Sequence, residues 1–469
     1  MRIAMIGTGY VGLVSGACFA DFGHDVTCVD KDQSKIAALT SGQIPIFEPD
    51  LDRLVAANVQ QNRLRFTADL AGAVRSADVV FIAVGTPSRR GDGHADLTYI
   101  HTATREIAAA LEGFTVVVTK STVPVGTGDD VERLIAETNP NADVTVASNP
   151  EFLREGAAIR DFKHPDRIVV GTDDERARAS LTEVYRPLCL NQSPIMFTSR
   201  RTAELIKYAA NAFLATKITF INEIADLAEK VGADVQDIAR GIGLDNRIGA
   251  KFLHAGPGFG GSCFPKDTRA LVKTAQDHNV PLRIVEAVLS VNEARKRAMA
   301  RKVSAAFGGS IRGKTVGILG LTFKPNTDDM REAPSIQLIT ALRDLGANIR
   351  AYDPVGKVQA LKEMPDLEIV DGPYECAENA DALVIVTEWE QFRALDLDRI
   401  RDLMTHPIII DLRNIYRPEY MASRGFLYES IGRRPHTPKR VVFYNAPPLV
   451  PQPAAGFESA GDRNDDLKV

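Results

Sequence analysis

The fold is decided at residues 2–12, which read RIAMIGTGYVG. A short apolar run leads into glycines at positions 7, 9 and 12, and apolar residues at helical spacing then continue to Gly23. A strand that ends in GxGxxG and opens a helix is typical of a dinucleotide-binding turn. Gly7 permits the tight turn, Gly9 lets the backbone approach a pyrophosphate, and Gly12 lets helix and strand pack closely.

An acid at the end of the next apolar run supports this prediction. Residues 24–30 read HDVTCVD, so Asp30 follows Gly12 at about the twenty-residue spacing of a ribose-binding carboxylate. A carboxylate there accepts hydrogen bonds from the adenosine ribose and repels a 2′-phosphate, so we predict NAD rather than NADP as the cofactor. Lys31 weakens that preference slightly. Outside this context, the same glycines would indicate only a turn.

The chain divides into segments of different pattern. Near-continuous apolar runs between helices fill residues 1–198 and return over 309–433, which indicates parallel sheets covered on both faces. Residues 199–308 show helical spacing only, beginning with one long helix at 199–232. We therefore expect an α/β protein with two Rossmann-like, doubly wound parallel-sheet domains joined by a central helical segment. The expected strands lie at residues 2–7, 24–30, 77–85, 114–121, 143–150, 314–320, 347–354, 380–388 and 406–414.

Composition excludes several classes of function. With 45% hydrophobic residues, 25% charged residues and a net charge of −5, the chain is typical of globular proteins and argues against a nucleic-acid-binding surface. No apolar run is long enough to cross a membrane and the N-terminus resembles a strand, so we expect a cytoplasmic protein. Five cysteines without close pairs predict no disulfides, and eight histidines without ligand spacing predict no metal site. Residues 434–469, rich in Pro, Gly, Asp and Asn, are expected to be disordered.

A glycine-rich loop in the middle of the chain carries the most suggestive chemistry. Residues 258–267 read GFGGSCFPKD, which places Cys263 on a flexible backbone close to Lys266 and Asp267. Lys266 or the upstream Lys251 could lower the pKa of the thiol, and Asp267 could act as an acid or base. The alternative is a packed core thiol, which is the commoner role of a lone cysteine.

Other candidates follow the strands of the first domain. Thr86 in GTPSRRGDG and Thr122 in KSTVPVGTG leave the edge at which open parallel sheets bind ligands, although threonines are also ordinary turn residues. Glu151 and Glu155 in NPEFLREG could bind a ligand or activate water, or could simply favour a helix dipole.

The long helix adds a second pair. Lys207 and Asn211 are four residues apart and share a face among apolar neighbours. The lysine therefore either extends its charge past apolar surface into water or points at a substrate.

A dinucleotide and a nucleophilic cysteine together suggest one reaction. Oxidation of an alcohol gives an aldehyde, and a thiolate captures the aldehyde as a thiohemiacetal. A second oxidation gives a thioester, and water releases an acid. Covalent capture explains why an alcohol dehydrogenase would need a cysteine.

These motifs resemble a known family. GTGYVG, STVP, NPEFLREG, the helix with Lys207 and Asn211, GFGGSCFPKD and FKPNTDDMREAPS occur in the same order in the nucleotide-sugar dehydrogenases, the UDP-glucose/GDP-mannose dehydrogenase family. The resemblance covers residues 1 to 433. It implies two Rossmann-like domains and a long helix that forms the core of a homodimer. It also implies oxidation of UDP-glucose to UDP-glucuronate with two NAD and one water, a step of nucleotide-sugar metabolism and polysaccharide biosynthesis.

The resemblance also implies roles for individual residues. Cys263 resembles the nucleophile, Lys207 a group that stabilises the developing oxyanion, and Glu151 a carboxylate involved in thioester hydrolysis. Asp267, Asn211 and Thr122 resemble residues that position a water. The residues that resemble cofactor contacts are Gly7, Gly9, Tyr10, Val11, Gly12, Asp30, Lys35, Thr86, Thr122, Glu155, Lys266 and Arg331. Those that resemble substrate contacts are Glu151, Phe152, Leu153, Glu155, Lys207, Asn211, Phe252, Leu253, Gly256, Gly260, Lys324, Arg413 and, reaching into the neighbouring subunit, Arg247.

The second α/β domain gives independent support for a different ligand. Its first turn, GILGLTFKPNTDD at 317–329, lacks the glycines that hold a pyrophosphate, and Lys324 offers a cation to a diphosphate instead. Three alternatives remain open. A GDP-mannose enzyme would share the cysteine loop, although GLDNRIG and DFKHPDRIVVG favour UDP-glucose. A two-electron hydroxy-acid dehydrogenase would not need that loop, and an NAD-sensing scaffold would leave the reactive side chains as coincidence.

Overall fold

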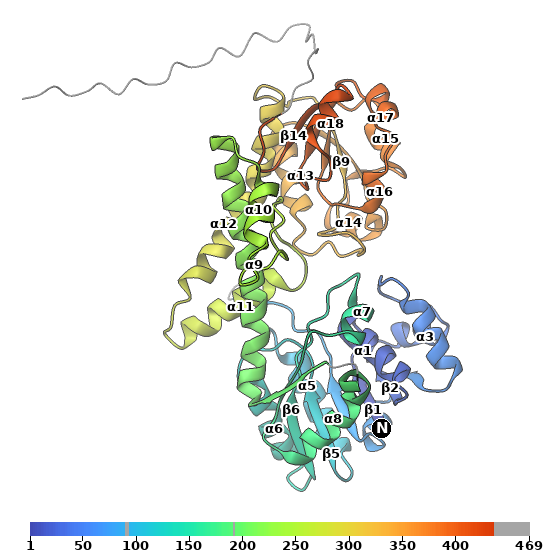
Figure 1. The fold of residues 1–469 in the computed structure, drawn as a ribbon. Coiled ribbons are helices and arrows are strands. Elements are labelled where there is room, and N and C mark those ends of the chain that lie inside the picture. Colours follow the sequence, from blue (N-terminus) through green and yellow to red (C-terminus); the bar gives the residue numbers. More distant parts are fainter. Residues whose placement is uncertain (90–92, 191–192, 436–469) are drawn as a thin grey trace, which may run out of the picture.

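The computed structural model describes residues 1–89, 93–190 and 193–435. An N-terminal lobe and a C-terminal lobe lie at the two ends of one long helix (Figure 1). The tail predicted to be disordered, 434–469, lies outside the described residues from position 436 onward. No helix built from the described residues has the length and hydropathy needed to span a bilayer.

The N-terminal lobe is built on an eight-stranded sheet in the order β3-β2-β1-β4-β5-β6-β7-β8. Its strands are β1 (Arg2–Ile6), β2 (Asp25–Val29), β3 (Leu64–Thr67), β4 (Val79–Ile82), β5 (Thr115–Thr119), β6 (Val144–Ser148), β7 (Ile168–Gly171) and β8 (Ile195–Thr198). Its helices are α1 (Tyr10–Asp21), α2 (Gln33–Thr40), α3 (Leu51–Gln60), α4 (Leu70–Arg75), α5 (Thr98–Ala110), α6 (Thr127–Thr138), α7 (Ala158–Lys163) and α8 (Glu175–Leu190).

Alternate residues of the central strands enter two separate cores. On β4, Phe81 packs into the cluster formed with α1, whereas Val80 and Ile82 pack into the cluster formed with α5 and α6. Every residue of β4 and β5 is buried, because helices cover both faces of the sheet. The continuous apolar runs of the sequence have this physical origin.

One pairing departs from the predicted parallel sheet. β6 and β7 run antiparallel and pair only at Ser148 and Gly171, the last residue of each strand. β7 thus approaches β6 from beyond its carboxyl end, and the segment between the two strands carries the NPEFLREG loop and α7. The sheet is therefore mostly, not wholly, parallel.

The predicted long helix is α9 (Arg200–Val231), which has 32 residues and a length of about 48 Å. Ser199 caps its first turn and Gly232, at φ 76°, ends it. The other central helices are α10 (Val235–Gly243), α11 (Phe264–Asp277) and α12 (Arg283–Ala306). α11 and α12 pack against α9, so the central segment is helical as predicted.

Both ends of α9 are tied to a neighbouring lobe. Glu204 accepts hydrogen bonds from the backbone N–H groups of Gly126 and Gly128, at 2.7 and 2.8 Å, where α6 begins. Near the other end, Glu229 accepts a 2.8 Å hydrogen bond from the backbone N–H of Gly432 and pairs with Lys302.

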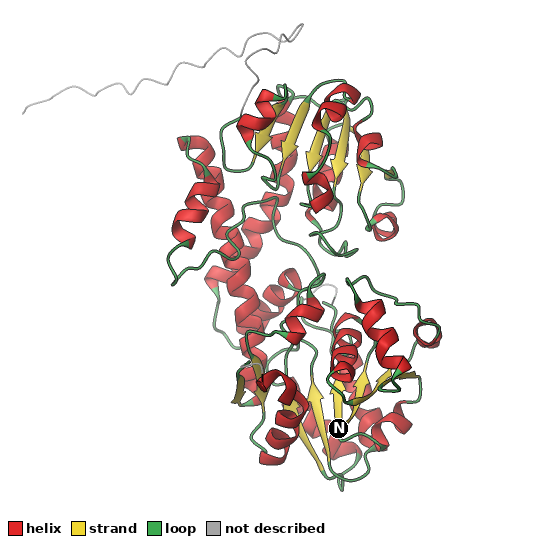
Figure 2. Ribbon diagram, turned by 45° about the vertical axis from the view of Figure 1, so that its right-hand side comes forward, coloured by secondary structure: helices red, strands yellow, loops and turns green. Residues whose placement is uncertain are grey.

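The C-terminal lobe holds a six-stranded sheet in the order β11-β10-β9-β12-β13-β14, whose pairings are all parallel among the described residues (Figure 2). Its strands are β9 (Thr315–Leu319), β10 (Asn348–Tyr352), β11 (Glu368–Ile369), β12 (Ala382–Ile385), β13 (Ile408–Asp411) and β14 (Leu427–Ser430). Its helices are α13 (Pro334–Asp344), α14 (Lys357–Glu363), α15 (Pro373–Ala377), α16 (Glu390–Arg393), α17 (Leu397–Leu403) and α18 (Pro418–Ser423). The two-sheet fold predicted from the sequence is confirmed.

Candidate functional site

The glycine turn between β1 and α1 has the shape that a pyrophosphate needs. Gly7 has φ +105°, and a Cβ placed there would lie 2.6 Å from the carbonyl oxygen of Ala83. A Cβ on Gly12 would lie 1.9 Å from the carbonyl oxygen of Gly7, so the close helix–strand contact requires glycine. A Cβ on Gly9 would meet no atom within 4 Å. The space beside Gly9 is therefore free for a ligand, and the residues present fit a dinucleotide.

Asp30 ends β2 beside this turn. Its carboxylate accepts hydrogen bonds from the backbone N–H of Thr8 at 3.0 Å and from the Thr8 hydroxyl at 2.7 Å, and Lys35 Nζ lies 3.9 Å away. Partial burial opposes ionisation, but hydrogen bonds from Thr8 and Asp32 outweigh it and lower the pKa of Asp30. Asp30 is therefore an ionised acceptor at the position where a ribose is expected.

The loop before Cys263 is held by buried polar side chains of α9 and α12. Asn222 accepts a 2.8 Å hydrogen bond from Gly256 N–H, and Asn292 accepts one of 2.8 Å from Phe259 N–H. Arg295 donates through Nε to the carbonyl oxygen of Gly256 at 2.6 Å. The loop is fixed on the central helices, so Cys263 does not sit on the mobile backbone that its glycines suggest.

Cys263 lies immediately before α11, with its thiol 3.5 Å from the Ser262 hydroxyl. Burial raises the pKa of Cys263 to about 11, although Lys207 opposes the shift. The lysine with the largest effect on this pKa is thus Lys207 on α9, rather than Lys266 or Lys251, which are nearer in the sequence. Lys266 instead pairs with Asp267 at 2.7 Å.

α9 brings Lys207 and Asn211 to the cysteine on one helical face. Lys207, which is 3% exposed, lies with Nζ 3.3 Å from Glu151 Oε1. Burial lowers the pKa of Lys207, but the charges of Glu151, Cys263 and Asp267 outweigh burial and raise it. Asn211 donates through Nδ2 to Asp267 Oδ2 at 2.7 Å. Four predicted catalytic side chains and the cysteine therefore form one buried cluster.

Glu155 joins the two lobes. It accepts hydrogen bonds from the hydroxyls of Ser262 at 3.0 Å and Thr327 at 3.4 Å, and Arg331 Nη2 lies 3.3 Å from it. Burial, followed by the charge of Asp329, raises the pKa of Glu155 to about 7, and Arg331 limits the shift. The predicted cofactor contacts Glu155 and Arg331 thus meet across the junction of the lobes.

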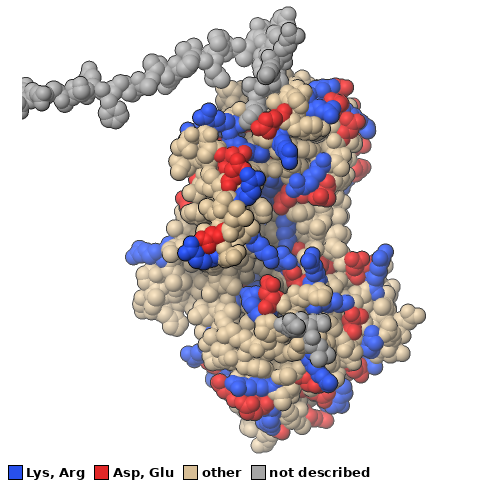
Figure 3. Space-filling view, viewed as in Figure 1, with Lys and Arg blue, Asp and Glu red and all other residues tan. Residues whose placement is uncertain are grey.

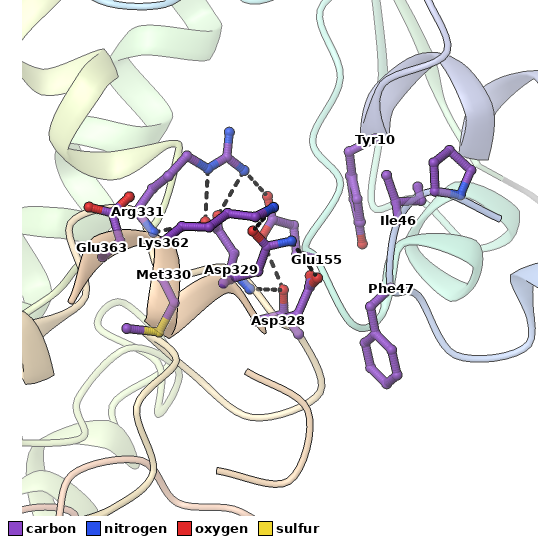
Figure 4. Close-up of a pocket in the computed structure, with 13 residues that line it drawn as sticks. Tyr10, Ile46, Phe47, Glu155, Asp328, Asp329, Met330, Arg331, Lys362 and Glu363 are labelled. Atoms are coloured by element: carbon purple, nitrogen blue, oxygen red, sulfur yellow. Dashed lines mark hydrogen bonds and ion pairs between the residues drawn. The ribbon is translucent and has the colours of Figure 1, made fainter. Parts of the chain in front are cut away.

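A pocket of about 340 Å³ opens at this junction (Figure 4). Tyr10 of the glycine turn and Phe47 lie on one side of it, across from Arg331 and Asp329 on the C-terminal lobe. The pocket also contacts Glu155, so it adjoins the glycine turn and the interlobe contact together. A space-filling view shows a recess at the waist of the molecule with Lys and Arg side chains around it (Figure 3).

Two cations predicted to bind substrate belong to the C-terminal lobe. Burial lowers the pKa of Lys324, whose Nζ lies 5.3 Å from the centre of the Phe323 ring. Arg413 donates to the carbonyl oxygens of Val386 at 2.7 Å and Phe323 at 3.2 Å. A Cβ on Gly256 would lie 3.1 Å from Arg413, so this arginine adjoins the cysteine loop.

The remaining predicted substrate contacts lie around the same loop, with one exception. Phe252 has φ +66° and its ring centre lies 6.0 Å from that of Phe264, whereas Leu253 is buried. A Cβ on Gly260 would collide with the carbonyl oxygen of Glu332. Arg247 lies apart, because its side chain is 90% exposed and pairs with Asp245 at 2.6 Å.

Other predicted residues complete the two sites. Lys207 Nζ lies 5.3 Å from the Phe152 ring centre, and Leu153 N–H donates to Glu151. Thr86 donates to the carbonyl oxygen of Thr122 at 2.9 Å, which ties the two predicted loops together. Val11 follows Tyr10 in the first turn of α1.

Sequence reasoning missed Ser262, Thr327 and Asp329, which all act on Glu155. All three lie inside the quoted motifs GFGGSCFPKD and FKPNTDDMREAPS, but neither local spacing nor residue type signals a contact with a position so far away in the chain. It also missed Glu48, which accepts hydrogen bonds from Tyr10 OH and, at 2.6 Å, from Gly156 N–H. Across the described ranges, no group of three or more His, Cys, Asp or Glu side chains is arranged to hold a metal ion.

Comparison with known proteins matches the whole arrangement to one family. Residues 1–189 match the NAD binding domain of the UDP-glucose/GDP-mannose dehydrogenase family, residues 201–294 its central domain, and residues 317–418 its UDP binding domain.

Individual relatives are similar over nearly the full length. A UDP-glucose 6-dehydrogenase of Rhizobium meliloti (strain 1021) is 70% identical over 435 residues, which cover 92% of this chain and 100% of the relative. The UDP-glucose 6-dehydrogenase TuaD of Bacillus subtilis (strain 168) is 47% identical over 434 residues, covering 92% and 93%. The solved structure of a UDP-glucose dehydrogenase from the archaeon Pyrobaculum islandicum has a TM-score of 0.84 at 38% identity, covering 91% of this chain and 96% of that one.

Proposed function

The chain belongs to the UDP-glucose/GDP-mannose dehydrogenase family, and on that premise we propose that it oxidises UDP-glucose to UDP-glucuronate with two NAD and one water. The observation that carries the proposal is the buried cluster of Cys263, Lys207, Glu151, Asn211 and Asp267 beside an NAD-binding fold. A two-electron dehydrogenase would have no use for the cysteine in that cluster.

The cofactor would be held by the glycine turn, Asp30 and the interlobe contact of Glu155 with Arg331. When bound, NAD supplies the hydride acceptor for each of the two oxidations. The open space at Gly9 admits its pyrophosphate, and ionised Asp30 would bind the ribose hydroxyls. The remaining chemistry falls to the chain's own side chains.

Cys263 would capture the aldehyde formed by the first oxidation. A bond forms between Sγ and the aldehyde carbon, the thiol proton leaves, and the carbonyl oxygen gains a proton to give a thiohemiacetal. Because the pKa of the resting thiol is about 11, capture requires a group that takes its proton and a cation that faces the developing oxyanion. Lys207 supplies that cation in a water-poor site, where a fixed charge is most effective.

Proton transfer and hydrolysis would use the carboxylates of the cluster. Asp267, held by Asn211, would orient a water with Thr122 and assist removal of the hydroxyl proton. After the second oxidation, water attacks the thioester carbon, the C–S bond breaks, and Cys263 regains its proton. Glu151, 3.3 Å from Lys207, would assist this hydrolysis.

The substrate's nucleotide would lie on the C-terminal lobe. Lys324 and Arg413 flank the cysteine loop, where they would neutralise a diphosphate. The curated relatives that we describe favour UDP-glucose as the sugar nucleotide, and GDP-mannose is the alternative within the family.

We also propose a homodimer built on α9. Phe213, Phe220 and Leu227 recur every seven residues along the helix and are 66%, 51% and 57% exposed. An apolar stripe of this kind is typical of a buried interface. Lys217 holds the Ile248–Gly249 segment against α9, so Arg247 lies close enough to this helix to reach a partner subunit.

The domains we assign are residues 1–198 for NAD, 199–308 for dimerisation and catalysis, and 309–433 for UDP. We place the reaction in the cytoplasm, as a step toward polysaccharide biosynthesis.

The decisive experiment is the yield of NADH per mole of UDP-glucose, with GDP-mannose run in parallel. We expect two NADH with UDP-glucose and little turnover of GDP-mannose. One NADH per UDP-glucose at completion would overturn the four-electron mechanism.

Cys263→Ala tests the covalent step directly. We expect turnover to fall by roughly three orders of magnitude or more, because the aldehyde is no longer captured. Cys189→Ala, which removes another free thiol that is not deeply buried, should keep full activity. In a Glu151→Gln enzyme, mass spectrometry should detect the uronyl group on Cys263. Full activity of Cys263→Ala, or a label on another residue, would contradict the proposal.

A further inference from the structure

Lys120 is a buried lysine that the proposed mechanism does not use. It follows β5 and is 3% exposed, and its Nζ lies 5.8 Å from the ring centres of Phe81, Phe162 and Tyr185. Among the described residues, no carboxylate forms an ion pair with it. Its hydrogen-bond acceptors are Asn149 Oδ1 at 3.1 Å and Tyr185 OH at 3.2 Å, both neutral groups. A buried cation without a counter-charge opposes folding, so its presence calls for another explanation.

Asn149 links this lysine to the loop that carries Glu151. Its side-chain oxygen accepts from both Lys120 and Tyr185, and its Nδ2 donates to the carbonyl oxygen of Val169 at 2.8 Å. Its backbone N–H donates to the carbonyl oxygen of Thr119 at 2.8 Å. Asn149 thus bridges β5 and β7 next to the antiparallel join of β6 with β7. Two residues later, Glu151 contacts Lys207.

The charge of Lys120 also reaches the catalytic pair. Glu151 and Lys207 are the two charged groups with the largest effect on it, Glu151 favouring its ionised form and Lys207 opposing it. The other titratable group that faces it is Tyr185 of α8. The cation is therefore close enough to Glu151 and Lys207 for their charges to act on it.

We propose that Lys120 is a positioning residue for the reaction: through Asn149 it fixes the turn that carries Glu151, and its buried positive charge attracts the carboxylate of Glu151 beside Lys207. The inference rests on the proposed function. It explains why the protein tolerates an unpaired buried cation at this place.

The charge of Lys120 changes within the working pH range. Burial lowers the pKa of Lys120 to about 8. The lysine is therefore almost fully charged well below pH 8 and loses its charge as the pH rises through that value. Loss of the cation removes its attraction for the Glu151 carboxylate and its repulsion of Lys207.

Lys120→Met tests the proposal by removing the charge while keeping most of the side-chain volume. We expect kcat to fall about tenfold or more and the acid limb of its pH profile to move upward by about 0.5 unit or more, because the positive charge that attracts the Glu151 carboxylate has been removed. The melting temperature should stay equal or rise, because a buried unpaired cation has been removed. Lys120→Arg should restore part of kcat.

Two further variants distinguish the effect of the charge of Lys120 from the effect of the hydrogen bonds around it. Asn149→Asp places a carboxylate on Lys120 with almost no change in volume, although it also loses the hydrogen bond to the Val169 carbonyl oxygen. It neutralises the cation and should move the acid limb in the same direction. Tyr185→Phe removes the hydrogen bonds of Tyr185 with Lys120 and with Asn149 but keeps the charge of Lys120, so it should leave the limbs of the profile in place. Asn149→Asp also provides the test if Lys120→Met does not fold.

The outcomes distinguish this inference from the proposed function. All variants should still yield two NADH per UDP-glucose. A Lys120→Met enzyme with wild-type kcat and pH profile would overturn the role of Lys120 alone, as would an equal shift in Tyr185→Phe. A loss of activity that follows a loss of melting temperature in every variant would indicate a structural role only. One NADH per sugar in the wild type would overturn the proposed function instead.

Discussion

The turn after β1 in the first sheet and the turn after β9 in the second sheet start with the same glycine conformation but continue into different structures. Gly7 after β1 has φ +105°, and Gly320 after β9 has φ +90°. A Cβ on either glycine would strike the end of the neighbouring strand, at Ala83 O (2.6 Å) or Thr387 (2.5 Å to its Cβ). Both lobes thus use the same tight turn out of a central strand.

The acids that follow show the first difference. Asp30 accepts hydrogen bonds from Thr8 and Asp32 and lies beside the open space at Gly9. Asp353, at the end of β10, is 4% exposed and is surrounded by donors from its own lobe. These donors are the N–H groups of Leu321, Thr322, Val355 and Gly356, the Thr322 hydroxyl and Trp389 Nε1. One acid can bind a ligand, whereas the other is committed to structure.

The chain after each turn shows the second difference. α1 begins at Tyr10, directly behind the glycines, whereas α13 does not begin until Pro334. The intervening loop reaches the first lobe, where Thr327 and Arg331 contact Glu155. It also contacts the cysteine loop, where the carbonyl oxygen of Arg331 accepts a hydrogen bond from Gly261 N–H. The turn of the second sheet therefore leads into a long loop, whose residues Thr327, Asp329 and Arg331 line the interlobe pocket across from Tyr10.

The largest expected effect tests the helix that follows the first turn. Gly12→Ala would place a methyl carbon 1.9 Å from Gly7 O and should lower the free energy of unfolding by about 4 kcal/mol, measured by urea denaturation. Gly9→Ala is the matched control: it should change stability by less than about 0.5 kcal/mol yet weaken NAD binding about tenfold or more in calorimetry. Equal losses of stability in the two variants would contradict the prediction that only Gly12 is required for the close contact of helix and strand.

The second effect tests the two acids. Asp353→Asn turns an amide toward several N–H donors and should destabilise the protein by about 3 kcal/mol without changing the affinity for NAD. Asp30→Asn should show the opposite pattern, a smaller loss of stability with weaker NAD binding and weaker rejection of NADP. Thermal unfolding and titration with both cofactors measure the two quantities. A loss of NAD affinity in Asp353→Asn would contradict the assignment.

The smallest effect tests the contact between the lobes. Because the pKa of Glu155 is raised to about 7 in the folded protein from an ordinary value of 4.5, the folded state holds a proton that the unfolded state releases first. The free energy of unfolding should therefore fall as the pH rises from 4.5 to 7, by on the order of 2 kcal/mol relative to Glu155→Gln. Denaturation at several pH values measures this slope. Parallel pH profiles of the two proteins would show that burial does not shift this carboxyl group.

The sequence predicted the long helix and most of the strands that helices cover on both faces of a sheet. Continuous apolar runs identified β1, β2, β4, β5, β6, β9, β10, β12 and β13, and an unbroken helical pattern identified α9. The short edge strands β3, β8, β11 and β14 escaped prediction because their residues are partly exposed, and β11 has only two residues. β7 was missed as well, and its antiparallel join depends on the route of the preceding loop.

The site was predictable where one motif carries several of its residues. Asn211 and Lys207 share a helical face, and Cys263 and Asp267 share a loop and the following turn, so spacing alone groups each pair. The two pairs come together only in the folded chain, where Asn211 donates a 2.7 Å hydrogen bond to Asp267. Sequence spacing does not predict this contact. The environment of the thiol was also not predictable from the sequence, because the lysine with the largest effect on its pKa, Lys207, is distant from Cys263 in the chain.

The fastening of α9 at both ends limits how the two lobes can move. Each residue of an α-helix turns about 100° around the axis, so the hydrogen bonds of Glu204 set the direction in which Lys207, three residues later, must point. Glu229 sets the same rotation at the opposite end. Helix α9 therefore resists twisting about its axis, so the two lobes can separate only if the helix bends along its length.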